Sequence, residues 1–147
     1  MRVGISNDDA VPVDFDGDGR ADQAIYRNGE WHLNRSSQAY TVINFGLATD
    51  KPVIGDFDGD GKTDLAVYRG GTWYLQQSSN GFTAFQFGIA SDTPAPADFD
   101  GDGETDIAVF RPSNGVWYIL RSSDSNVNYR QFGLSGDLPT PSAFIQQ

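Results

Sequence analysis

The segment Asp56-Phe57-Asp58-Gly59-Asp60-Gly61-Lys62-Thr63-Asp64 decides how this sequence is interpreted. Carboxylates stand at positions 1, 3, 5 and 9 of the segment, and glycine stands at position 6. Alternate carboxylates in a tightly turned loop converge on one point, where four anions are tolerable only around a hard cation. Calcium takes about six to eight oxygen ligands from carboxylates, backbone carbonyls and water. The segment therefore predicts a calcium-binding loop.

The same segment occurs three times, beginning at Asp14, Asp56 and Asp98, with 42 residues between successive copies. Each copy is followed by an apolar run ending in Arg, a Trp segment, a Ser-Ser pair and a Phe-Gly pair. The Trp residues repeat with nearly the same period, since Trp31 and Trp73 are 42 residues apart and Trp117 follows at 44. The chain is therefore expected to be one domain, residues 1–147, built from tandem repeats.

Each loop is expected to bind one Ca²⁺ through its carboxylates at positions 1, 3, 5 and 9 and its backbone carbonyl at position 7. The predicted ligands are Asp14, Asp16, Asp18, Arg20 and Asp22; Asp56, Asp58, Asp60, Lys62 and Asp64; and Asp98, Asp100, Asp102, Glu104 and Asp106. Magnesium is less suited because it demands a small octahedron and keeps its waters. An Asp/Gly-rich turn without metal is the alternative, and three copies at fixed spacing weigh against it.

These loops differ from the EF-hand, which needs a bidentate Glu at position 12. Here position 12 is Ile25, Val67 or Val109, which already belongs to the following apolar run. The sites are therefore predicted to join two strands.

The charge of the chain is concentrated in the loops. Twelve aspartates of the three segments, among 20 acidic side chains in all, account for the net charge of −10. Three divalent cations would reduce that charge to −4. A bare chain would repel nucleic acids and anionic membranes, so neither is expected as a partner. The longest apolar run, Val116 to Leu120, is too short to span a bilayer.

The periodicity of the apolar residues is two, which predicts four short strands in each unit. In the second unit they lie around Val53-Ile54, Leu65 to Arg69, Trp73 to Gln76 and Thr83 to Phe87. The Leu65 strand is apolar on both faces, so its sheet should be covered on both sides by similar sheets. The tight-turn sequences between the second and third strands are Asn28-Gly29, Gly70-Gly71 and the longer Pro112 to Gly115.

The three Asp-x-Asp-x-Asp-Gly-x-x-Asp loops and the pairs Phe45-Gly46, Phe87-Gly88 and Phe132-Gly133 resemble the FG-GAP or VCBS repeat family, the blades of integrin-α-type β-propellers. The resemblance implies an all-β fold of three four-stranded propeller-blade-like repeats of about 42 residues, whose loops bind calcium. Propellers have about four to eight blades. Three repeats therefore predict an open stack or part of a composite propeller.

The ends of the chain align with parts of the repeat. Val3 to Asp8 matches Phe87 to Asp92, and Pro139 to Phe144 matches Pro94 to Phe99, with Ala143 in place of the first calcium Asp. The expected repeats are residues 10–51, 52–93 and 94–138. Residues 1–9 and 139–147 are expected to form the last strand and the first strand of incomplete units.

An arginine and an aspartate also recur. We expect an Arg–carboxylate clamp between neighbouring repeats, formed by Arg27, Arg69, Arg111, Asp50, Asp92 and Asp137, because guanidinium pairs bidentately with carboxylate. A role of the arginines in ligand recognition is the alternative. Asn34-Arg35-Ser36 is a possible glycosylation sequon, and the Ser-Ser pairs are possible O-linked sites.

The aromatic residues have structural roles in this interpretation. Trp31, Trp73 and Trp117 should pack between sheets. His32 should be a surface ring at the position of Tyr74 and Tyr118, and these rings either form a ladder that stacks on sugars or pack against the next unit. The sequence contains no nucleophile elbow or phosphate-binding Gly-rich loop, so no enzyme activity is expected.

The predicted function is that of a non-catalytic, calcium-stabilised extracellular protein. Sites of this kind suit the millimolar calcium found outside cells. The pattern starts directly after Met1, so this form is expected to lack a signal peptide. Its partners would be other copies, joined head to tail through unpaired terminal strands into a surface or matrix filament. The alternative is an adhesion module that binds a carbohydrate or a protein.

Overall fold

The computed structural model describes residues 9–35 and 37–132, and of residues 9–12 the backbone alone. All regular secondary structure in this part of the chain is β-strand. The strands are β1 Asp9–Val13, β2 Asp22–Arg27, β3 Glu30–Asn34, β4 Thr41–Asn44, β5 Lys51–Gly55, β6 Asp64–Arg69, β7 Thr72–Gln77, β8 Gly81–Gln86, β9 Thr93–Pro94, β10 Ile107–Arg111, β11 Val116–Leu120 and β12 Val127–Gln131. They form three four-stranded antiparallel sheets in chain order, β1 to β4, β5 to β8 and β9 to β12, and none of them closes into a barrel.

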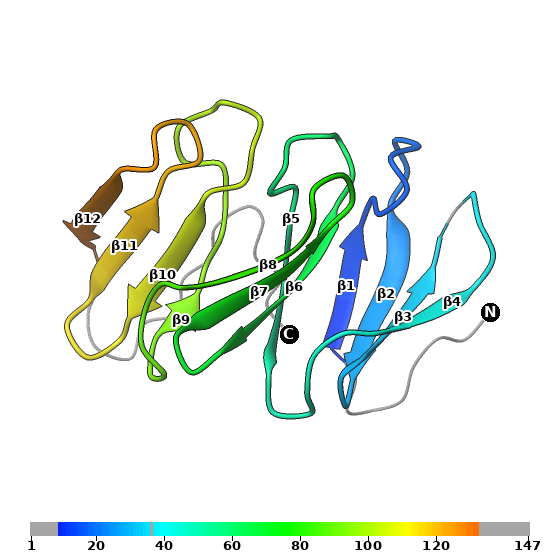
Figure 1. Cartoon of the computed structure of the whole chain (residues 1–147), viewed down its shortest axis with the longest axis horizontal. Helices are drawn as coiled ribbons and strands as arrows, with labels where there is room; N and C mark the ends of the chain where they lie inside the picture. Colours follow the sequence, from blue (N-terminus) through cyan, green and yellow to red (C-terminus); the bar gives the residue numbers. More distant parts are fainter. Residues whose placement is uncertain (1–8, 36, 133–147) are drawn as a thin grey trace.

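The sheets lie one behind another in a row, from blue through green to orange (Figure 1). The second sheet shows how they pack, because both of its faces are buried. Leu65 and Val67 of β6 join a core with Trp31 and Leu33 of the first sheet. Ala66 and Tyr68, on the opposite face of β6, join a second core that includes residues of the third sheet. The prediction that each internal sheet is covered on both sides by similar sheets is confirmed.

Each sheet therefore has two faces of different kind. We call the face that packs on the preceding repeat the leading face, and the face that carries the Trp the trailing face. In the core between the second and third repeats, the leading face consists of Ile107, Val109, Tyr118 and Leu120.

The predicted tight turns adopt the backbone that their sequences allow. Asn28 and Gly29 have φ values of 52° and 86°, and Gly70 and Gly71 have 58° and 92°. Two successive positive φ values are typical of the type I′ turn that joins antiparallel strands. The hairpins between β2 and β3 and between β6 and β7 could therefore be predicted from these dipeptides alone.

The Phe-Gly pairs close each repeat. The indole N–H of Trp73 donates to the backbone carbonyl of Phe87 at 2.9 Å, and the indole of Trp31 donates to Phe45 at 3.1 Å. Gly88 follows with a φ of 112°, and a Cβ there would collide with the hydroxyl of Tyr68. The pair thus fixes the end of each repeat against its own Trp, and glycine is required by both conformation and space.

The predicted strands agree with the structure to within a few residues, and the third repeat departs most. Its first strand, β9, has only two residues, followed by an isolated bridge between Ala97 and Asp106. Pro94 and Pro96 lack the N–H that a longer ladder needs. The incomplete units predicted at residues 1–9 and 139–147 lie outside the described residues, apart from Asp9, which begins β1.

Candidate metal sites

The three acidic loops lie between the first and second strands of their sheets, and Figure 1 shows them along the same side of the row, at the top of the view. Each loop ends in a buried Asp, which begins the following strand in the first two repeats and directly precedes it in the third. The turn is possible because the glycines at positions 4 and 6 have positive φ, for example 73° at Gly59 and 87° at Gly61. The strand–loop–strand setting expected from the sequence is thus the one the structure has.

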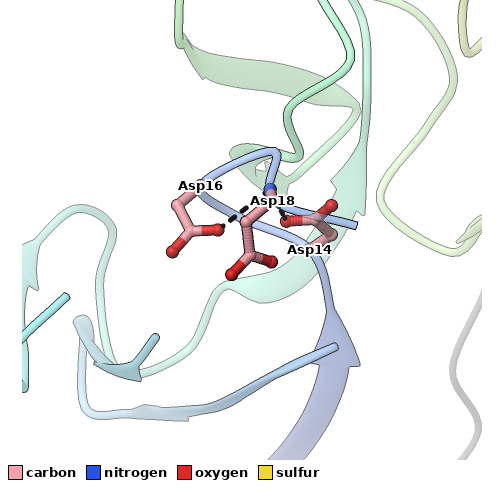
Figure 2. Close-up of side chains that lie close together, drawn as sticks. All are labelled: Asp14, Asp16 and Asp18. Carbon is pink, nitrogen blue, oxygen red and sulfur yellow. Dashed lines mark hydrogen bonds between the residues drawn. The ribbon is translucent and has the colours of Figure 1, made fainter. Parts of the chain in front are cut away.

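Three carboxylates come together in each loop. Oxygen atoms of Asp14, Asp16 and Asp18 lie within 4.8 Å of one another, and Figure 2 shows the three side chains around one point. In the other two loops, the grouped residues are those at positions 1, 3 and 9. They are Asp56, Asp58 and Asp64, and Asp98, Asp100 and Asp106. The predicted ligands Asp22, Asp60 and Asp102 are outside these groups, and the role of the carbonyls of Arg20, Lys62 and Glu104 stays a prediction.

The first carboxylate of each loop is surrounded by backbone N–H groups. Asp98 accepts hydrogen bonds from Gly101 at 2.7 Å and from Gly103 at 2.9 Å. In the middle loop, Asp56 accepts from Asp60 at 3.1 Å and from Gly61 at 2.8 Å. The loop backbone thus wraps around this side chain and orients it before any ion binds.

The last carboxylate of each loop is buried, and those of the middle and third loops accept hydrogen bonds on both oxygens. In the middle loop, Asp64 accepts from the N–H of Phe57 at 2.8 Å and from the N–H of Ser78 at 2.8 Å. Asp106 accepts in the same way from Phe99 and Ser122, at 2.7 Å and 2.8 Å. Burial raises the pKa of Asp64, against the effect of these hydrogen bonds. This side chain therefore has a structural role in closing the loop, in addition to its place among the grouped carboxylates.

Serines from the turn between the third and fourth strands reach the loops. The hydroxyl of Ser78 donates to Asp60 at 2.5 Å, and that of Ser79 donates to the same carboxylate at 2.6 Å. In the third repeat, Ser123 donates to Asp100 at 2.6 Å. These bonds hold the pKa of Asp60 well below its usual range. The sequence interpretation missed these contacts and proposed the serines as possible sugar attachment sites. Their recurrence at the repeat period was the available signal.

Adjacent loops also touch each other. The N–H of Thr105 donates to the carbonyl of Asp56 at 2.9 Å, and its hydroxyl accepts from the N–H of Asp56 at 2.9 Å. The N–H of Thr63 donates to the carbonyl of Asp14 at 3.0 Å. A Cβ on Gly59 would lie 2.7 Å from Cγ of Glu104, which shows how closely the loops approach. The three sites therefore form a ladder in which each loop braces the one before it.

The middle loop is more enclosed than the third. Burial raises the pKa of Asp56, whereas the backbone N–H of Gly103 and its neighbours lower the pKa of the equivalent Asp98. The difference follows from position, because Asp56 lies between two other loops and Asp98 is exposed. The donor set itself fits calcium: hard oxygen atoms, several of them anionic, grouped within one coordination sphere.

Comparison with known families agrees with this architecture. The model of an FG-GAP-like repeat matches residues 56–109, and that of an FG-GAP repeat matches residues 92–127. These matches support the FG-GAP repeat family over residues 56–127. FG-GAP repeats form modules of the β-propeller type, usually occur in extracellular proteins and often bind calcium. Neither the comparison with curated proteins nor that with solved structures gave a match. No helix able to cross a membrane is found among residues 9–35 and 37–132.

Between FG-GAP repeats, two of the predicted Arg–Asp pairs form. Arg69 donates through Nε and Nη2 to the two oxygens of Asp50, at 2.6 and 2.7 Å. Arg111 donates to Asp92 in the same bidentate way, at 2.7 and 2.9 Å. Each aspartate side chain is fully buried in the connection between two repeats, and each arginine lies on the following sheet. Hydrogen bonding to the carboxylate raises the pKa of both arginines.

The pairing of the other two predicted clamp residues, Arg27 and Asp137, stays a prediction. Arg27 has an interaction of its own, and Asp137 lies outside the described residues. The guanidinium groups also stack on rings, since Arg69 lies 4.5 Å from the ring centre of Tyr74 and Arg111 lies 4.4 Å from that of Tyr118. These contacts occupy the arginines structurally, and a direct role in ligand recognition stays untested.

Two further predicted positions are His32 and Asn34. His32 is buried, with 8% of its surface exposed, so its prediction as a surface ring is wrong. Its ring nitrogens contact Tyr40 and Glu30, at 2.5 and 3.2 Å. Asn34 donates its side-chain amide to Gln23 at 2.9 Å, and its glycosylation stays a prediction.

Proposed function

We propose that this chain is a non-catalytic, calcium-stabilised module of an extracellular protein, with a structural role in which it associates with other copies of itself. The observation that carries the proposal is the grouping of three carboxylates in every loop, with their oxygens within 4.8 Å. The loops are joined to one another, so an ion in each would stabilise a surface common to all three repeats.

Calcium would act on stability rather than on chemistry. Its positive charge would offset the repulsion of the grouped carboxylates, and three ions would reduce the net charge from −10 to −4. At a free concentration one hundredfold above the dissociation constant, each site would add about 2.7 kcal/mol to the free energy of unfolding. The serine hydroxyls and backbone N–H groups already direct the carboxylates inward, which reduces the ordering cost of binding.

Removal of calcium tests this proposal. Isothermal titration should give three ions per chain, and excess chelator should lower the melting temperature. The variant Asp58→Asn should bind two ions, because Asp58 belongs to the group of the middle loop. Asp124→Asn is the matched control, since it removes the same charge from an exposed carboxylate outside the loops and should keep three. A melting temperature indifferent to chelator would contradict the proposal.

A second candidate function, adhesion to a carbohydrate or protein, is supported by a groove on the trailing face of the third repeat. Its volume is about 750 Å³, and its lining includes Phe99, Trp117, Ile119, Asn128, Arg130 and Phe132. This volume is in the range of small-molecule sites. A glycan array probed with the calcium-loaded protein would test it directly. Head-to-tail joining through the terminal strands involves residues outside the described part of the chain and stays a prediction.

A further inference from the structure

The trailing face of the third repeat exposes apolar side chains that the other two repeats bury. Phe99 is 40% exposed, while its equivalents Phe15 and Phe57 are 7% and 8% exposed. Trp117 is half-buried, while Trp31 and Trp73 are fully buried. Phe132, at the rim of the same face, is 73% exposed. This concentration of aromatic surface around one groove is typical of an interaction site.

The molecule itself shows what kind of surface covers such a face. The trailing face of the second repeat, with Trp73 and Phe57, is covered by the leading face of the third, which presents Ile107, Val109 and Leu120. The covering surface is therefore apolar and belongs to a β-sheet. The groove continues the same series of stacked sheets, so an apolar sheet surface is the partner that its chemistry requires.

The first repeat does not offer that surface to another copy. On its leading face, Gln23 and Asn34 occupy the positions of Leu65 and Gln76 in the second repeat and of Ile107 and Leu120 in the third. Gln23 is exposed and hydrogen-bonded to Asn34. Ile25 and His32, which share this face, are only 7% and 8% exposed, so its central part is already covered. Placing this face on the aromatic groove of a second copy would bury amide groups against apolar rings.

A second copy exposes an apolar sheet face at its own groove. Two charged side chains mark the ends of that groove. Asp100 lies at the loop end, where Arg121 of the lining is itself paired with Asp124. Arg130 lies opposite Trp117 in the strand register, near the other end. Leu120 lies at the loop end of β11, about 10 Å from Trp117 along the strand, so Asp100 and Arg130 are well separated. A twofold axis in the interface, perpendicular to the strands, inverts the groove and brings each Arg130 over the acidic end of the other copy. The same operation keeps the two sets of acidic loops apart.

We propose that two copies of this chain associate through the trailing faces of their third repeats, as an isologous dimer with inverted grooves. This inference rests on the proposed role in self-association and names the surface and symmetry of one contact. Such a contact uses the same patch on both copies and closes on itself, so it produces dimers rather than open filaments.

Sedimentation velocity of the full chain, with calcium and over a range of protein concentrations, tests the inference. The monomer has a mass of 16.0 kDa, and the unchanged protein should form a reversible species of twice that mass. Phe132→Glu should weaken dimerisation at least about tenfold, because it puts a charge in place of an aromatic ring that the interface would bury. It leaves in place the hydrogen bond from the indole N–H of Trp117 to the backbone carbonyl of residue 132. Phe82→Glu is the matched control. Phe82 is 60% exposed on β8 of the second repeat, away from the groove, so this variant should dimerise normally.

Two further variants test the symmetry. Arg130→Glu should weaken the dimer several-fold, and more so at low salt, since it puts like charges together. The chain has no cysteine, so Ile119→Cys places a single thiol near the predicted axis. It should give disulfide-linked dimers under oxidation, whereas Phe82→Cys should not.

The outcomes separate this inference from the proposed function. A protein that titrates three calcium ions and stays monomeric at every concentration retains its metal sites and overturns the dimer. Oligomers that grow beyond two copies, or dimers unaffected by Phe132→Glu, overturn the twofold contact. A monomer that binds a glycan and loses it in Phe132→Glu assigns the groove to adhesion instead. Failure to bind calcium, with dimerisation intact, contradicts the metal sites and leaves the dimer standing.

Discussion

The second and third repeats have the same sequence pattern and different surroundings. Trp73 is fully buried between two sheets, while Trp117 at the equivalent place is half-buried at the groove. Both indoles donate to the carbonyl of the Phe that ends their repeat, at 2.9 and 3.0 Å. The pattern therefore determines the repeat itself, whereas the neighbouring sheet determines how much each residue contributes to stability.

The largest expected difference lies between Trp73→Ala and Trp117→Ala. Truncating a buried Trp costs about 3–5 kcal/mol, because it leaves a cavity and removes apolar contact. Trp73→Ala should reach that range. Trp117→Ala should cost roughly half as much, since solvent already reaches the ring. Urea unfolding in calcium, at protein concentrations low enough to avoid dimers, measures both. Equal costs would mean that Trp117 is covered as fully as Trp73.

The Arg–Asp pairs give the next largest effect. Arg69→Gln and Arg111→Gln each leave a buried carboxylate without its cation, and loss of one partner of a buried ion pair costs up to about 3–5 kcal/mol. The arginines are 38% and 22% exposed, so solvent reduces the cost to about 2 kcal/mol, with the larger value for Arg111. Arg121→Gln is the control, because its partner Asp124 is itself exposed and the change should be nearly neutral. Denaturant unfolding measures the three, and a neutral Arg111→Gln with lost ligand binding would assign the arginines to recognition.

Much of the fold could be predicted because it depends on local chemistry. The hairpin dipeptides Asn28-Gly29 and Gly70-Gly71 require positive φ and adopt it. The two-sided apolar strand at Leu65 to Arg69 implies a sheet with neighbours on both faces, and the two cores lie there. The spacing of the aspartates likewise indicated that the carboxylates of each loop would converge.

Contacts between distant segments could not be predicted in the same way. The Ser pairs recur with the repeat, which shows that the positions matter, but not that they contact aspartates about 20 residues earlier. His32 shares a position with Tyr74 and Tyr118, yet its burial depends on Tyr40 from the following turn. Exposure of Trp117 depends on what lies beyond the third sheet, and a repeat pattern contains no information about that.

A smaller difference between the repeats is one hydroxyl group. Tyr68 of the second repeat donates to the carbonyl of Ile89 at 2.7 Å, whereas the third repeat has Phe110 at this position. Tyr68→Phe makes the second repeat resemble the third and should cost about 1 kcal/mol, the net contribution of one hydrogen bond.

The same hydroxyl gives the comparison a pH dependence. Burial raises the pKa of Tyr68 to about 12, above the ordinary tyrosine value of 10.0. The protonated phenol is thus favoured in the folded state, so its contribution is complete below pH 10 and is lost as the pH rises towards 12. The stability difference between the unchanged protein and Tyr68→Phe should shrink over that interval. Urea unfolding at pH 8 to 11 measures it, and a constant difference would show that ionisation of Tyr68 is not linked to unfolding.

The smallest expected effect concerns the contact between adjacent loops. Thr105 belongs to the third loop, but its hydroxyl accepts from the N–H of Asp56 in the middle loop. Thr105→Val removes this bond with little change of shape and should cost about 0.5–1 kcal/mol. Because the bond orients Asp56, calcium should bind the middle loop several-fold more weakly, while the third loop keeps its affinity.

The amide signals of Gly61 and Gly103 distinguish the two loops in a calcium titration by NMR, since each N–H donates to the first Asp of its own loop. Thr63→Val is the matched control, because Thr63 is joined to Asp14 through its backbone N–H, which the substitution retains. If Thr105→Val instead weakens calcium binding to the third loop, as reported by Gly103, each loop depends on its own residues alone. If it weakens binding at Gly61, as we expect, the affinity of an FG-GAP loop depends partly on the next repeat. Calcium binding would then be subject to the same neighbour effect that separates Trp73 from Trp117.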